Sequence, residues 1–201
     1  MNISMERQAH GFSYQAEKIK QYNLSTIDPK TGKELLYTDK WDAFYNNIPV
    51  QIKDKQKGGN VELADIFRQS ETTEDFILIV GFWETEKTNI IEEHILYIKG
   101  NEWHSYFDST CLYKYQTLLK IITNNHSDDA KWTQETNQLR KEWKKVTPYL
   151  IVPRPKRDHK DQKRIQCAIN KTTFYKYFLP KYEVGDFFER NDKIIRAKKQ
   201  I

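Results

Sequence analysis

The sequence predicts a single domain of the α/β class, spanning residues 1–201. A length of 201 residues suits one domain, and 13% aromatic residues can fill a core. Residues 76–83 are the most apolar segment, which is typical of a strand buried on both faces. Apolar residues at helical spacing over residues 111–123 and 131–145 predict amphipathic helices. Strand and helix patterns therefore alternate along the chain.

The remaining elements are predicted from local patterns. Asn46-Asn47 separates two short strand patterns, and Asn tolerates the positive φ that a two-residue hairpin turn demands. Asn60 follows a glycine pair and is expected to cap a helix. Pro180 is expected to end the last helix. We predict helices over residues 12–22, 61–69 and 170–178, and strands over residues 40–45, 48–53, 89–99, 103–107, 149–152 and 165–169.

The net charge of +5 is unevenly distributed. Residues 148–201 carry 14 Lys/Arg against 6 Asp/Glu, whereas residues 1–147 carry 19 against 22. A basic final third fits a polyanionic partner, and it equally fits a solvated basic face.

Other sequence features narrow the class of protein. Cys111 and Cys167 are the only cysteines, so there is no disulfide framework and no zinc-binding pattern. No stretch approaches the length of a membrane span, and the N-terminus lacks the apolar run of a signal peptide. We therefore expect a reduced, cytoplasmic setting.

The most informative segment is the predicted hairpin over residues 41–53. With Asn46-Asn47 as the turn, Asp42 lies opposite Gln51 in a non-hydrogen-bonded pair, where side chains are closest. Lys53 shares the face of Gln51, because side chains alternate along a strand with a period of two. A carboxylate, an amide and an ammonium group therefore converge on one face.

These groups suit phosphodiester hydrolysis. Asp42 would bind Mg²⁺, a hard cation that prefers oxygen ligands. The Gln51 side-chain oxygen and the Ile52 carbonyl would complete the protein's share of the ligands. Lys53 would orient or help to deprotonate the attacking water and hold the scissile phosphate, while the metal polarises that phosphate.

The segment Asp42…Gln51-Ile52-Lys53 resembles the motif of the PD-(D/E)XK nucleases, which include most type II restriction endonucleases. Trp41 occupies the position of the motif's proline, and Gln51 occupies that of its second acid. The resemblance implies a restriction-endonuclease-like core, with a mixed central sheet flanked by helices. It also implies Mg²⁺-dependent, site-specific cleavage of double-stranded DNA by a homodimer.

Two other acids are candidates for the missing carboxylate. Glu17 lies on the predicted first helix, where this family often places an acid near the metal. Glu62 opens the predicted helix after the motif, and some restriction enzymes carry the catalytic glutamate on that helix. The alternative for each is a solvated carboxylate on a helix face.

A basic segment within residues 148–201 is the predicted DNA-recognition portion. Arginines can bind guanine edges or phosphates, lysines mostly contact phosphate, and glutamine or asparagine can pair with adenine. A solvated loop or a nonspecific phosphate clamp is the alternative. The candidate DNA-binding residues are Arg154, Lys156, Arg157, His159, Lys160, Lys163, Arg164, Gln166 and Asn170.

The leading functional hypothesis is a type II restriction endonuclease. A DNA-binding or structural module without catalysis, and a repair or recombination nuclease of the same fold, are the alternatives. His159 and Asp161 also suggest an HNH-type nuclease, but the further His and Asn residues of that pattern are missing. The aromatic residues of 174–178 predict core packing rather than base stacking.

Overall fold

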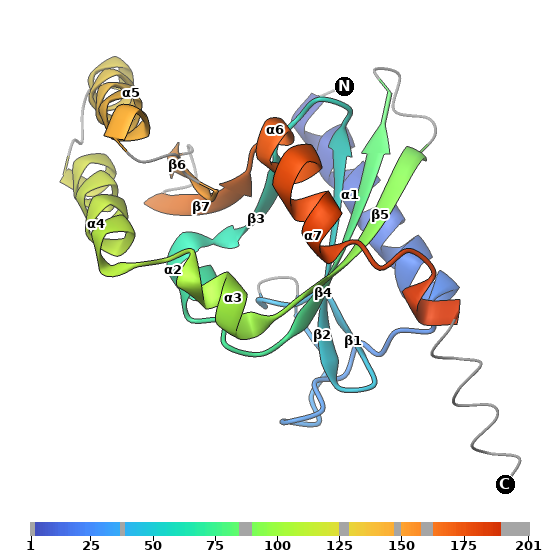
Figure 1. Cartoon of the computed structure of the whole chain (residues 1–201). Coiled ribbons are helices and arrows are strands. Elements are labelled where there is room, and N and C mark those ends of the chain that lie inside the picture. Colours follow the sequence, from blue (N-terminus) through green and yellow to red (C-terminus); the bar gives the residue numbers. More distant parts are fainter. Residues whose placement is uncertain are drawn as a thin grey trace, which may run out of the picture.

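The computed structural model describes residues 3–36, 39–84, 90–124, 129–146, 150–157 and 163–189. Within these ranges the protein has a mixed α/β architecture, which confirms the α/β class of the predicted fold. Two sheets form its framework, one with four strands and one with three. Helices surround both sheets (Figure 1).

The four-stranded sheet has the order β1-β2-β4-β5. β1 (Ala43–Tyr45) and β2 (Ile48–Gln56) are antiparallel, β2 and β4 (Phe76–Trp83) are parallel, and β4 and β5 (Ile90–Ile98) are antiparallel. Every residue of β4 is buried, as its continuous apolar sequence predicts. The sheet is therefore mixed, as expected.

Helix α1 (Ile3–Gln21) covers one face of this sheet. It starts well before residue 12, at which the sequence predicted the helix to begin. Tyr14 is buried in a cluster with Val50, Ile52, Ile77, Ile79 and Ile95. Gly81 on β4 allows the close approach, because a Cβ there would lie 2.6 Å from the Tyr14 ring.

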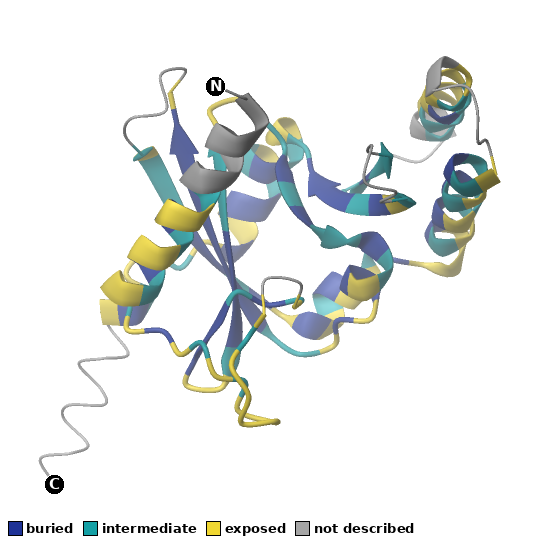
Figure 2. Cartoon of the chain, turned by 180° about the vertical axis from the view of Figure 1, so that it is seen from behind, coloured by how far each residue is buried: buried dark blue, intermediate teal, exposed yellow. Residues whose placement is uncertain are grey.

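The opposite face packs against the second sheet, which has the order β3-β7-β6. Its strands are β3 (Val61–Asp65), β6 (Val152–Arg157) and β7 (Lys163–Ile169), and all pairs are antiparallel. Helices α4 (Ser109–Asn124) and α5 (Asp129–Val146) match their predictions and lie beyond this sheet (Figure 1). Buried residues concentrate along the strands, whereas α1 exposes its outer side (Figure 2).

Two predicted elements are wrong in type. Residues 61–65 form strand β3, because Val61 and Leu63 alternate with less buried residues, and helix α2 is confined to Ile66–Ser70. Asp65 caps α2 in place of Asn60, accepting a hydrogen bond from the Phe67 N–H at 2.9 Å. The strand predicted over residues 103–107 is replaced by helix α3 (Gly100–Ser105), which buries Trp103.

The last described helices differ less from prediction. Asn170 caps α6 (Lys171–Thr173) through its side-chain oxygen, which accepts from the Thr173 N–H at 2.9 Å. A π-helix (Phe174–Phe178) and α7 (Leu179–Tyr182) follow without a break. The chain thus remains helical through Pro180, which occupies the first turn of α7. Phe174 and Phe178 are core residues, as predicted.

Candidate functional site

The hairpin of β1 and β2 has the predicted register, with Tyr45 opposite Ile48 and Ala43 opposite Val50. Asn46 and Asn47 have φ values of 48° and 67°, as a two-residue turn with two positive φ angles requires. Regular pairing ends at Ala43, and the Asp42 N–H donates to the Val50 carbonyl at 3.0 Å. Asp42 therefore lies where β1 begins, beside the middle of β2.

Asp42 and Lys53, which the sequence placed on one face of the hairpin, are in direct contact. Asp42 Oδ2 accepts hydrogen bonds from Lys53 Nζ at 2.8 Å and from the Ile52 N–H at 2.7 Å. The side chains are 18% and 25% exposed, so the pair is half-buried and open to solvent. The backbone hydrogen bond fixes the carboxylate against β2, which makes the position of Lys53 Nζ well defined.

Gln51 lies on the same face of β2 as Lys53, yet it is only 1% exposed. Its Nε2 donates to the Lys40 carbonyl at 3.1 Å. Its Oε1 is buried and has no hydrogen-bond partner among the described residues. A buried carbonyl oxygen without a partner costs about 1–3 kcal/mol, a cost that a bound cation or water would offset.

The ligands for a divalent cation are few. In the described part of the chain, no group of three or more His, Cys, Asp or Glu residues is arranged to hold a metal ion. The predicted set of Asp42, Gln51 and the Ile52 carbonyl offers one carboxylate and two neutral oxygens. This set fits Mg²⁺, which usually keeps several waters and binds through one or two carboxylates plus substrate phosphate.

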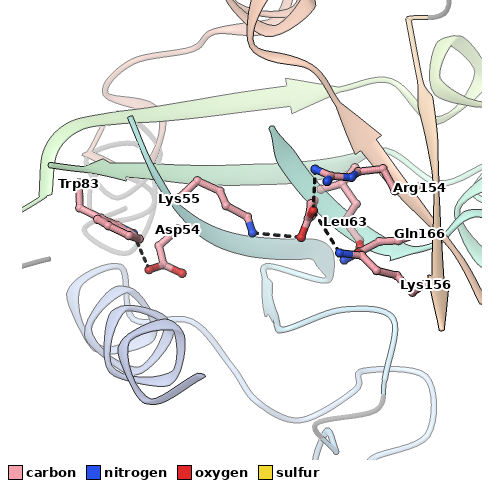
Figure 3. Close-up of polar contacts among 8 residues, drawn as sticks. Asp54, Lys55, Leu63, Trp83, Arg154, Lys156 and Gln166 are labelled. Atoms are coloured by element: carbon pink, nitrogen blue, oxygen red, sulfur yellow. Dashed lines mark hydrogen bonds and ion pairs between the residues drawn. The ribbon is translucent and has the colours of Figure 1, made fainter. Parts of the chain in front are cut away.

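Glu62 occupies strand β3 rather than a helix, and it contacts three cations. Its Oε2 lies 3.1 Å from Lys55 Nζ, and its Oε1 lies 3.0 Å from Arg154 and 3.4 Å from Lys156 (Figure 3). Burial by itself would raise the pKa of Glu62, but these cations outweigh burial and hold that pKa below its ordinary value. Glu62 is therefore an ion-pair centre between β2 and β6.

Lys55 is the site residue that sequence reasoning missed. It lies two residues after Lys53 on β2 and therefore on the same face of the sheet. The two-residue spacing of Lys53 and Lys55, at the end of a predicted strand, was the sequence feature that could have placed Lys55 on the face of Lys53. Its contact with Glu62 could not be anticipated, because Glu62 was assigned to a helix.

Glu17 lies away from Asp42 and Lys53. Its helix α1 packs on the face of the sheet that carries Val50 and Ile52, opposite the face of Lys53. The Glu17 side chain is 61% exposed and lies 3.1 Å from Lys18 Nζ. The interpretation as a solvated carboxylate fits this position, and the role of an acid near the metal does not.

A buried ion network on the α1 side was not predicted. Lys18 Nζ lies 2.7 Å from Glu93 Oε2, and the hydroxyls of Tyr14 and Tyr22 donate to the same carboxylate at 2.7 and 2.6 Å. Burial opposes ionisation of Glu93, but these hydrogen bonds hold its pKa below the ordinary value. The network anchors α1 to β5.

The basic segment between the strands predicted over residues 149–152 and 165–169 was expected to be a loop, but its described residues belong to β6 and β7. β6 and β7 pair Lys156 with Arg164 and Arg157 with Lys163, so like charges lie directly opposite one another. Such pairs destabilise a sheet unless an anion compensates them. Pro153 belongs to β6, which is tolerated because β6 is an edge strand.

The other candidate DNA-binding residues have different positions. Gln166 Nε2 donates to the Leu63 carbonyl at 3.1 Å, at the irregularity between β3 and β7 (Figure 3). Asn170 uses its side-chain oxygen as a helix cap. Both amides therefore have structural hydrogen bonds. His159 and Lys160 lie outside the described residues.

Comparisons with protein-family models, curated proteins and solved structures gave no match. The described residues therefore form a mixed α/β domain that no comparison identifies. Its notable features are the half-buried pair of Asp42 and Lys53 and the paired basic strands β6 and β7. Among the described residues, no helix is long and apolar enough to cross a membrane.

Proposed function

We propose that this protein is a Mg²⁺-dependent endonuclease that cuts double-stranded DNA at specific sites, in the manner of type II restriction enzymes. The contact between Asp42 and Lys53 carries the proposal. Gln51 lies on the same face of β2 as Lys53, and its Oε1 has no hydrogen-bond partner among the described residues. These are the positions at which the segment resembles the PD-(D/E)XK motif. The basic pairs of β6 and β7 support a polyanionic substrate.

In this proposal each side chain has a defined task. Asp42 binds Mg²⁺, and Gln51 Oε1 and the Ile52 carbonyl supply further oxygens. Bound Mg²⁺ supplies Lewis acidity and charge stabilisation at the phosphate. Lys53 exchanges its contact with Asp42 for one with the scissile phosphate, where it neutralises charge and orients the attacking water. A homodimer would present two such sites to a palindromic sequence.

A second candidate is a DNA-binding module without catalysis. The amide at Gln51, in place of a carboxylate, favours it, because one acid alone holds Mg²⁺ weakly. A repair or recombination nuclease of the same fold would use the same groups as the leading proposal. It would differ in cutting without a fixed recognition sequence.

Plasmid cleavage in Mg²⁺ tests the proposal. We expect discrete fragments from the wild type, and at least about 100-fold slower cleavage by Asp42→Asn and Lys53→Met. DNA binding measured in EDTA should remain in both variants, because most affinity comes from the basic strands. Glu102→Gln, which neutralises a carboxylate on α3, is the matched control and should cut like the wild type.

Three outcomes decide between the candidates. Full activity of either purified site variant would remove Asp42 and Lys53 from the active site. Wild-type binding without cleavage of any tested DNA would favour the non-catalytic module. A smear of products in place of discrete bands would favour the repair or recombination nuclease.

A further inference from the structure

The cluster around Glu62 carries more positive charge than its carboxylate neutralises. One acid contacts Lys55 from β2 and both Arg154 and Lys156 from β6, within 3.4 Å in each case. The three cations are 33–38% exposed, whereas Glu62 is 16% exposed. In Figure 3 the side chains of Lys55, Arg154 and Lys156 point toward one another from two strands. The cluster thus presents accessible cations around a recessed carboxylate.

We infer that this cluster is a second phosphate-binding site for the DNA backbone, at which Glu62 competes with phosphate for the three cations in the free protein. The inference rests on the proposed function and deepens it. It gives Glu62 the role of an inhibitory placeholder, in place of the metal-ligand role suggested by its sequence position.

The chemistry of the cations favours a phosphate. The guanidinium of Arg154 has a planar fork that matches two phosphate oxygens, and lysine ammonium groups bind phosphate as point charges. Two of these cations share the single Oε1 atom of Glu62, so they compete for it. Lys156 also lies opposite Arg164 in the β6–β7 pairing, which adds positive charge beside the cluster.

The position of the cluster fits a backbone that also reaches Lys53. Lys53 and Lys55 share one face of β2 and are separated by about 6.6 Å along the strand, at about 3.3 Å per residue. A DNA strand with one phosphate at Lys53 therefore has a nearby phosphate within reach of Lys55. Binding there would transfer cations from Glu62 to the DNA.

The test is the DNA affinity of Glu62→Gln, measured by fluorescence anisotropy with a short duplex in EDTA. Removing the competing charge should tighten DNA binding about fivefold to tenfold, because Glu62→Gln breaks three partly exposed ion pairs and frees their cations for the DNA. The log–log salt dependence should steepen by about one unit. Glu102→Gln is the matched control, since its carboxylate holds Lys181 at 3.1 Å, and its affinity should change less than twofold.

Lys55→Ala provides an independent variant. It should weaken binding about threefold to tenfold and reduce the salt slope by about one unit. If Glu62→Gln is folded but binds DNA no more tightly, or if Glu102→Gln gains as much, Glu62 is not a competitor. If Lys55→Ala binds like the wild type, Lys55 is only a structural partner of Glu62, which also overturns the site.

Cleavage measurements separate this inference from the proposed function. Tighter binding by Glu62→Gln in EDTA supports the phosphate site whether or not the wild type cuts DNA, because no metal takes part. Failure of the wild type to cut DNA under any condition would overturn the nuclease proposal and leave the binding result standing. Thermal unfolding of both variants confirms that they are folded.

Discussion

Replacing Gln51 by glutamate tests the proposed Mg²⁺ site directly. Gln51 is 1% exposed, and its Nε2 donates to the Lys40 carbonyl at 3.1 Å. A carboxylate there would lose that hydrogen bond, place an oxygen against the carbonyl, and bury a negative charge. An unsatisfied buried group costs about 1–3 kcal/mol, and a buried charge costs more. We expect metal-free Gln51→Glu to be less stable than the wild type by about 2–4 kcal/mol.

Mg²⁺ should reverse this loss if Gln51 faces the metal. Asp42 and the new carboxylate would together neutralise a divalent cation, and binding to the folded state stabilises it by RT ln(1 + [Mg²⁺]/Kd). At a Mg²⁺ concentration of about 100 times Kd the gain is about 2.7 kcal/mol. The wild type, with one carboxylate, should respond less. Gln51→Glu should also reach full cleavage at a lower Mg²⁺ concentration.

The assay is urea unfolding at pH 8 and pH 5, with EDTA or Mg²⁺. A buried glutamate has a raised pKa, so the folded variant takes up a proton as the pH falls, and its deficit in EDTA should shrink at pH 5. Gln51→Met is the matched control, which removes the amide but adds no charge and should not respond to Mg²⁺. If Gln51→Glu is folded and gains no more from Mg²⁺ than the wild type, Gln51 does not contact the metal.

Two further predictions concern the α1 side of the sheet. Glu93→Gln should lower the free energy of unfolding by about 2–3 kcal/mol at pH 7, because the buried Lys18 loses its charged partner. The pKa of Glu93 in the folded state is lowered from 4.5, so the stabilisation that its carboxylate gives is lost as the pH falls through that lowered pKa. The difference in unfolding free energy between Glu93→Gln and the wild type should therefore shrink in urea titrations at acid pH. Gly81→Ala should cost about 1–3 kcal/mol and lower the Tm by several degrees, because its Cβ would lie 2.6 Å from Tyr14. An unchanged Tm in calorimetry would contradict the packing of α1 on β4.

The predictable parts of the fold depend on short-range patterns. The positive-φ turn at Asn46-Asn47 and the two-residue alternation of β2 suffice to place Asp42 beside Lys53. Residues 76–83 combine length and continuous apolar character, which few structures other than a central strand can accommodate. These elements need no knowledge of distant contacts, so the sequence determines them well.

The errors arise where tertiary pairing decides the structure. Residues 61–65 have acids at positions that suit a helix start, but pairing with β7 makes them a strand. Pro153 and Pro155 favour a loop by local rules, yet an edge strand tolerates them. The contact of Glu62 with Arg154 joins residues far apart in the sequence, and it depends on how the two sheets pack. Local patterns contain no information on that packing.

Three unfavourable features on the side of the sheet that carries Lys53 share one physical explanation. The Gln51 oxygen is buried without a partner in the described structure, Lys156 opposes Arg164, and Glu62 has three cations for one charge. By contrast, Glu93 on the other face is matched by three donors. Each feature costs folding free energy, and proteins keep such costs mainly at functional sites. A hydrated divalent cation would satisfy the oxygen, and a phosphodiester backbone would satisfy the surplus cations. Metal-bound DNA, the substrate of the nuclease that we propose, would meet both requirements together.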